Sequence, residues 1–137
     1  MNLPTIENFD SWLDEILEKD LPDNIVAVSF NLYTEADDIY GWAIEFVGTD
    51  RYDKDDEYGG WACYEAYSDR DNMLYWKLPN HRMGADDMWQ TILQDATERI
   101  LNYLSNGRNA SKLKEYAAVG VGFVDGDLDV IYKKAVG

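Results

Sequence analysis

The sequence predicts an α+β domain, in which an antiparallel sheet of about five to six strands carries two main helices packed on one face. Two long segments place apolar residues at helical spacing, several shorter segments alternate apolar and polar residues, and turn signals separate these segments. The length of 137 residues fits one domain, residues 1–137, and a 46 % apolar content is enough to build its core.

Two segments have the apolar periodicity of amphipathic helices. The first runs from residue 6 to Pro22, and the second begins near Asp86 or Asp87 and ends at Asn106-Gly107. A short third helical piece is expected near residues 111–116. The apolar positions are Ile6, Phe9, Leu13, Ile16 and Leu17 in the first segment and Trp89, Ile92, Leu93, Ala96, Ile100 and Leu104 in the second.

Alternation with a period of two residues predicts the strands. Residues 24–34 and 40–48 each place apolar side chains on one face, and the EADD turn between them indicates an antiparallel hairpin. Residues 61–67 and 73–78 are expected to form the third and fourth strands. Near the C-terminus, Asp125-Gly126 has the sequence of a type I′ turn between two further strands.

The chain is strongly acidic, with 27 acids, 12 bases and a formal net charge of −15. This charge argues against binding to nucleic acid, which requires Lys and Arg, and against an anionic membrane surface. It favours basic partners. Residues 1–98 contain 23 acids and 6 bases, whereas residues 99–137 contain 4 acids and 6 bases, so the acidic field belongs to the first two thirds of the chain.

The cysteine content and the absence of long apolar runs indicate a cytoplasmic protein. Cys63 is the single cysteine, so no internal disulfide forms, and we expect it to be a small buried residue in a reducing compartment. The first ten residues lack the basic and apolar parts of a signal peptide. No apolar run approaches the ~20 residues of a membrane span.

The acid cluster at residues 50–57 does not fit a calcium loop. Asp53, Asp55 and Glu57 match positions 1, 3 and 5 of the EF-hand template, but Tyr58 and Tyr64 stand where glycine and glutamate belong. A start at Asp125 fails in the same way, because its sixth position is valine. We therefore expect no metal site and no cofactor.

Enzymatic chemistry finds little support in the sequence. Cys63 and His81 are the only soft metal ligands, too few for a structural zinc site, and neither has the surroundings of an activated nucleophile. No phosphate-binding glycine loop is present. A hydrolase that uses carboxylates, with or without a metal ion, is a less favoured alternative, because any acidic protein offers carboxylate pairs.

The aromatic residues point to a binding surface. Trp and Tyr supply 15 of the 19 aromatic residues, and Trp12, Trp42 and Trp89 are expected to be mostly core anchors. A sheet covered by helices on one face leaves its other face open, so some of the strand aromatics must lie there or at the rim, beside the acid cluster. The candidates are Tyr33, Trp61, Tyr64, Tyr67 and Tyr75.

The acid cluster that runs into GGWACYEAY, together with the late segment AAVGVGFVDGDLDVIYK, resembles the small immunity proteins of bacterial toxin–immunity systems. These include immunity proteins against contact-dependent and other polymorphic toxins. The resemblance covers the central strands and the C-terminal hairpin, and it rests on composition and element order rather than on a catalytic signature.

The resemblance implies a protein that is not an enzyme and that blocks a cognate toxin domain, expected to be basic, by steric and electrostatic means. Exposed aromatics would supply buried area, and acids would speed the encounter. A small acidic ligand-binding or regulatory domain is the alternative, and a plain solvated loop competes with the partner surface. The residues expected at the partner are Asp53, Asp55, Asp56 and Glu57 for steering, with Trp61 and Tyr64 as anchors.

Overall fold

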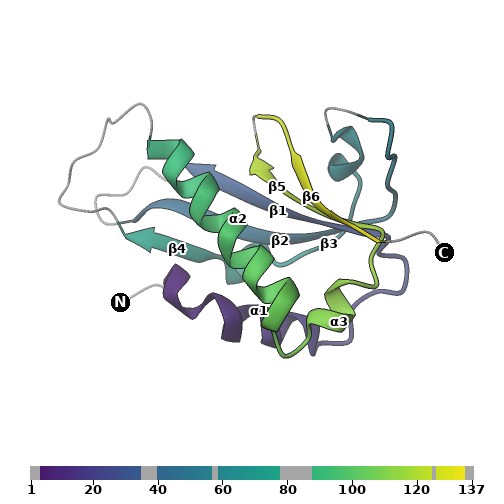
Figure 1. Ribbon diagram of the computed structural model, residues 1–137, viewed down its shortest axis with the longest axis horizontal. Helices are drawn as coiled ribbons and strands as arrows, with labels where there is room; N and C mark the ends of the chain where they lie inside the picture. Colours follow the sequence, from purple (N-terminus) through teal and green to yellow (C-terminus); the bar gives the residue numbers. More distant parts are fainter. Residues whose placement is uncertain (1–3, 35–39, 57–58, 78–87, 125, 135–137) are drawn as a thin grey trace.

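The protein is described by a computed structural model that covers residues 4–34, 40–56, 59–77, 88–124 and 126–134. Over these residues it is an α+β fold with one six-stranded sheet, three α-helices and three short 3₁₀ helices (Figure 1). The strands are β1 (Ala27–Thr34), β2 (Tyr40–Thr49), β3 (Glu65–Ser68), β4 (Leu74–Lys77), β5 (Ala118–Phe123) and β6 (Asp129–Lys133). The helices are η1 (Ile6–Asn8), α1 (Phe9–Leu17), η2 (Gly60–Cys63), η3 (Arg70–Asn72), α2 (Met88–Asn106) and α3 (Ala110–Leu113).

The strand order is β3-β2-β1-β5-β6, and β4 also pairs with β2. The ten-residue β2 is long enough to pair with β1 along one edge and with both β3 and β4 along the other. The predicted hairpin of β1 and β2 is confirmed. The prediction of a purely antiparallel sheet is wrong for the pair β1–β5, which is parallel, because a long connection through α2 and α3 returns the chain beside β1 in the same direction.

The main core lies between one face of the sheet and the helices. Phe30 of β1 is fully buried, and its ring centroid lies 6.2 Å from that of Phe9, 6.5 Å from that of Trp12 and 5.6 Å from that of Phe46. Helix α2 crosses the sheet and contributes the other side of this core, with α1 beside it (Figure 1). The apolar stripes predicted for the two helices supply most of the buried helical residues.

The second face of the sheet is also covered at one end, contrary to the expectation of an open face. Trp61 packs there against Ala27 of β1 and Ala118 of β5. Next to it, a Cβ atom built on Gly120 would lie 2.8 Å from the side chain of Leu128. The glycines of β5 therefore leave the space that Leu128 fills.

The third strand is shorter than predicted. The sequence indicated a strand over residues 61–67, but η2 occupies Gly60–Cys63 and β3 begins at Glu65. Gly59, with φ of 71°, adopts the left-handed conformation that turns the chain into η2. Cys63 is exposed in η2, so its predicted burial is wrong.

Some predicted features lie outside the described residues: the helix caps Asp86 and Asp87, His81, and Asp125 of the predicted type I′ turn. Among the residues that the structure describes, no helix is long and apolar enough to cross a membrane.

Gly59→Ala tests the junction between η2 and the second face. A Cβ atom at this position would meet the Cβ of Leu128 at 2.6 Å, and the backbone would be held in the left-handed region. We expect a loss of about 2 kcal/mol in the free energy of unfolding, measured by urea denaturation. Gly60→Ala is the control, because its φ is not in the left-handed region and its Cβ would meet only the end of the Asp56 side chain, which can move. Equal stability of the two variants would contradict this account of η2.

Candidate partner-binding surface

The acidic loop, described over residues 50–56 and 59–60, follows β2, and hydrogen bonds of its own backbone fold it back. The amide of Asp50 donates to the carbonyl of Tyr64 at 3.0 Å, which closes the loop at its base. Within the loop, the amide of Asp56 donates to the carbonyl of Asp53 at 3.1 Å. The amide of Asp55 donates to Oδ1 of Asp53 at 2.9 Å, so one carboxylate of the loop shapes the turn.

Two aromatic rings, those of Tyr52 and Trp61, fix the loop to the second face of the sheet. The ring of Tyr52 meets that of Trp61 edge to face, with centroids 5.1 Å apart. Trp61 is only 2 % exposed and rests on the alanines of β1 and β5. Its indole Nε1 is buried and has no acceptor among the described residues. This aromatic contact fastens the loop to the second face of the sheet.

The structure separates the predicted partner residues into distinct groups. Asp53 and Asp55 are exposed, and Asp56 is half-buried with its carboxylate over Gly60. Tyr64 is 49 % exposed at the base of the loop, and the guanidinium of Arg51 lies 3.8 Å from the centroid of its ring. Glu57 lies outside the described residues.

Trp61 differs from its expected place. It was predicted as an anchor for the partner, because the aromatic residues of the predicted strands cannot all point inward. In η2 its ring faces the sheet instead. A ring that is 2 % exposed has almost no surface to give a partner, so its burial disfavours the anchor role.

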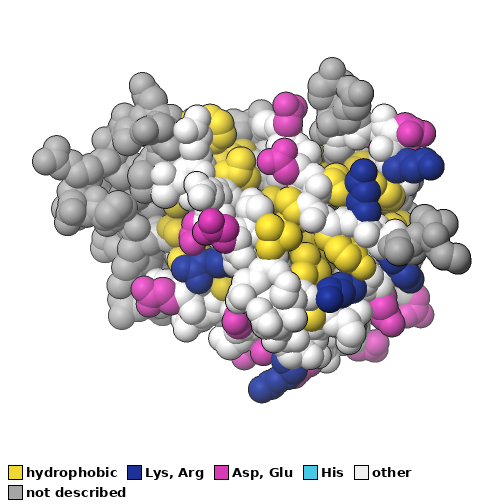
Figure 2. Space-filling model, in the orientation of Figure 1, with side chains coloured by type: hydrophobic (Ala, Val, Ile, Leu, Met, Phe, Trp, Pro, Cys, Tyr) yellow, Lys and Arg dark blue, Asp and Glu magenta, His cyan; other side chains and the backbone are white. Residues whose placement is uncertain are grey.

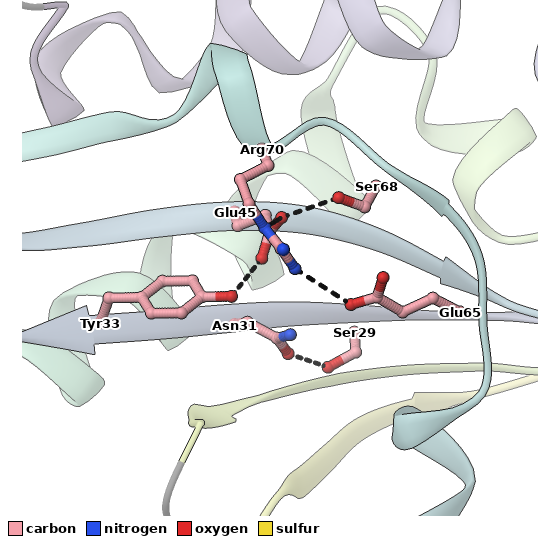
Figure 3. A network of polar contacts seen from close by, with 7 residues as sticks. All are labelled: Ser29, Asn31, Tyr33, Glu45, Glu65, Ser68 and Arg70. Atoms are coloured by element: carbon pink, nitrogen blue, oxygen red, sulfur yellow. Dashed lines mark hydrogen bonds and ion pairs between the residues drawn. The ribbon is translucent and has the colours of Figure 1, made fainter.

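A buried carboxylate, Glu45, organises the rest of the second face (Figure 3). Its side chain is fully buried and accepts hydrogen bonds from the Tyr33 hydroxyl at 2.5 Å, the Ser68 hydroxyl at 3.0 Å and Nε of Arg70 at 3.3 Å. Arg70 also reaches Glu65 at 3.4 Å. Burial, followed by the hydrogen bond to Glu45, raises the pKa of Tyr33 to about 12.

This network has a structural role. A carboxylate that already accepts three hydrogen bonds and has no exposed surface is poorly placed to act as a general base. Its donors come from β1, from β3 and from η3, so it fastens the edge of the sheet to its centre. Sequence alternation placed Glu45 and Tyr33 on this face correctly, but it gave no sign that Arg70 would join them.

A third feature, the aromatic pocket, lies between the start of α2 and the β5–β6 turn. Its volume is about 640 Å³. The Phe123 ring stands between two indoles, with centroids 5.7 Å from Trp42 and 6.3 Å from Trp89. Figure 2 shows hydrophobic side chains beside acidic ones over this part of the molecule. The described lining residues are Thr34, Trp42, Trp89, Leu93, Phe123, Gly126, Asp127 and Asp129.

The pocket was not predicted from the sequence, because its rings come from three separate elements. Trp42 is a buried anchor as expected, with 8 % of its surface exposed. Trp89 is 43 % exposed, so its predicted place in the core is wrong. It lies in the first turn of α2, where its ring packs against Phe123 and is otherwise partly exposed to solvent.

Metal ligation finds no geometric support in the described part of the chain. There, no group of three or more His, Cys, Asp and Glu side chains lies close enough to hold a metal ion. Asp53 and Asp55 of the partial calcium pattern instead form the turn described above.

Comparison of the chain with protein-family models, with curated proteins and with solved structures finds no significant match.

Glu45→Gln tests the buried network. The amide puts an N–H group where the carboxylate accepted hydrogen bonds, so at least one buried donor loses its acceptor. We expect a loss of about 2 kcal/mol in the free energy of unfolding, measured by urea denaturation.

Glu65→Gln is the matched control, because its side chain is 40 % exposed and meets the same arginine from the solvent side. Its cost should stay below about 0.5 kcal/mol. If Glu45→Gln lowered the free energy of unfolding as little as Glu65→Gln does, the network would not hold the edge of the sheet.

Proposed function

We propose that this protein is an immunity protein that binds a cognate bacterial toxin domain and blocks it without chemical change. The observation that carries the proposal is the formal net charge of −15, together with a fixed acidic loop that presents Asp53 and Asp55 to solvent. A toxin that acts on nucleic acid needs a positive surface to bind phosphates. An acidic inhibitor competes for that surface.

The fixed loop suits this mechanism. Carboxylates held in one arrangement raise the rate of encounter with a basic partner and disfavour partners of the wrong charge. Because the loop is anchored through Tyr52 and Trp61, little conformational entropy is lost when a partner binds. Tyr64, exposed at the base of the loop, adds aromatic contact area.

The carboxylates of the loop extend toward the C-terminal hairpin. Asp53, Asp56 and Asp129 line a groove whose lining also includes two lysines, Lys54 and Lys133. Asp129 in turn lines the aromatic pocket. The groove beside the loop and the pocket beside α2 therefore share Asp129 in the edge strand β6. The partner is proposed to bind around this edge, in the cytoplasm.

A small acidic ligand-binding or regulatory domain is the second candidate function. The aromatic pocket favours it, because concave sites lined mainly by apolar rings with a few polar groups are typical of ligand binding. Under this alternative the acidic loop is a solubilising surface, and no toxin is required. The two functions differ in whether a protein partner binds the loop.

Asp53→Asn combined with Asp55→Asn tests the steering role of the loop. The partner is the toxin domain encoded beside this gene, identified by pull-down and by rescue of growth. We expect the association rate at low salt, measured by stopped-flow fluorescence, to fall roughly 3- to 10-fold, with a weaker dependence on salt.

The matched control is Asp10→Asn combined with Glu15→Gln, which removes two exposed charges from α1. Its association rate should change less. If both double variants slow association equally, the net charge acts without any contribution from the loop. If neither does, steering by the acids is refuted.

A further inference from the structure

The aromatic pocket has the composition of a site for an organic cation. Three rings, those of Trp42, Trp89 and Phe123, stand at steep angles to one another, with interplanar angles of 67° and 79° for the two pairs. Each of these pairs sets the edge of one ring against the face of the other, and Trp89 keeps 43 % of its surface exposed. A cation over a ring face is attracted by the negative charge of the π system.

Two carboxylates complete the pocket. Asp127 and Asp129 line it, and both are exposed. Within the described ranges neither of them forms an ion pair with Lys or Arg. The pocket therefore combines aromatic rings with two carboxylates that form no ion pair with Lys or Arg among the described residues.

A contact of the same kind, between a guanidinium group, an aromatic ring and a carboxylate, occurs elsewhere in the chain. At the base of the acidic loop, the guanidinium of Arg51 lies 3.8 Å from the centroid of the Tyr64 ring and donates to Asp50 at 3.0 Å. There one arginine of the chain already occupies an aromatic face beside a carboxylate. In the aromatic pocket the described residues supply the ring faces and the carboxylates without the arginine.

We propose that the aromatic pocket receives an arginine side chain of the partner protein. Arginine fits better than lysine, because its planar guanidinium stacks on aromatic rings and its forked donors match carboxylates. That the arginine comes from a toxin rests on the proposed function. The preference of the pocket for a guanidinium group stands independently of that function.

The test uses the whole protein and a small probe. Nα-acetyl-arginine amide is titrated into ¹⁵N-labelled protein, and the five tryptophan indole signals are followed by NMR. The signals of Trp42 and Trp89 are assigned with single Trp→Phe variants. We expect these two signals to shift saturably, with a dissociation constant on the order of millimolar, as suits one isolated side chain. Nα-acetyl-citrulline amide, which has the same shape without the charge, should bind at least about tenfold more weakly.

Two variants locate the binding. Trp89→Ala removes an exposed ring and should weaken probe binding roughly 5- to 30-fold, and Asp127→Asn with Asp129→Asn should weaken it several-fold. Leu101→Ala on the exposed side of α2 and the loop variant Asp53→Asn with Asp55→Asn are the matched controls, and they should leave binding unchanged. The double Asp variant keeps the test decisive if Trp89→Ala lowers stability.

Three results would overturn the inference: no saturable shift of the Trp42 and Trp89 signals, equal binding of the citrulline probe, or equal weakening by the control variants. Binding of Nα-acetyl-lysine amide as tight as that of the arginine probe would overturn the choice of arginine.

The outcome is separable from the proposed function. If the probe binds and no toxin does, the pocket inference holds and the immunity function fails. If a toxin binds the Trp89→Ala variant with unchanged affinity and the probe does not bind, the immunity function holds and the pocket inference fails.

Discussion

The packing of Trp61 against the second face of the sheet is the contact on which the proposed binding surface depends. Burying an indole of this size stabilises the attached segment by several kcal/mol, on the order of the 3 to 5 kcal/mol that truncation of a buried tryptophan costs. Here the ring lies on the alanines of β1 and β5, whose small side chains leave room for it. The acidic loop is fastened through this ring and Tyr52.

The two faces of the sheet are stabilised by different kinds of interaction. The helix-covered face is apolar, and the ring contacts around Phe30 fill it. The second face combines a small apolar patch at one end with the buried carboxylate of Glu45 nearer its middle. Such a carboxylate is costly to bury unless it is fully hydrogen-bonded, and three donors meet that condition here. The network also restricts how β3 and η3 can sit on β2, which limits alternative registers at this edge.

Much of the fold follows from periodicity alone. Helical spacing located α1 and α2, and alternation located β1, β2, β4 and the C-terminal strands, because the helix face of the sheet is uniformly apolar. The parallel pairing of β1 with β5 could not be predicted, since it depends on how α2 and α3 carry the chain back across the sheet. The shortened third strand depends on one residue, Gly59, whose positive φ is a property of the folded backbone.

The candidate surface was harder to predict for a similar reason. The acids of the loop were visible as a cluster, and Asp53 and Asp55 are exposed as the cluster suggested. The burial of Trp61 was missed, because it requires η2 in place of a strand. The aromatic pocket was missed, because Trp42, Trp89 and Phe123 are far apart in sequence and meet only when α2 crosses the sheet.

Backbone dynamics of the acidic loop test the central claim most directly. The claim is that Trp61 holds the carboxylates in one arrangement before any partner arrives. We predict that ¹⁵N relaxation of the amides of residues 53–56 gives order parameters of about 0.85, as for rigid backbone in β1. Values below about 0.6 at these amides would mean a mobile loop on the picosecond to nanosecond timescale and would contradict the account.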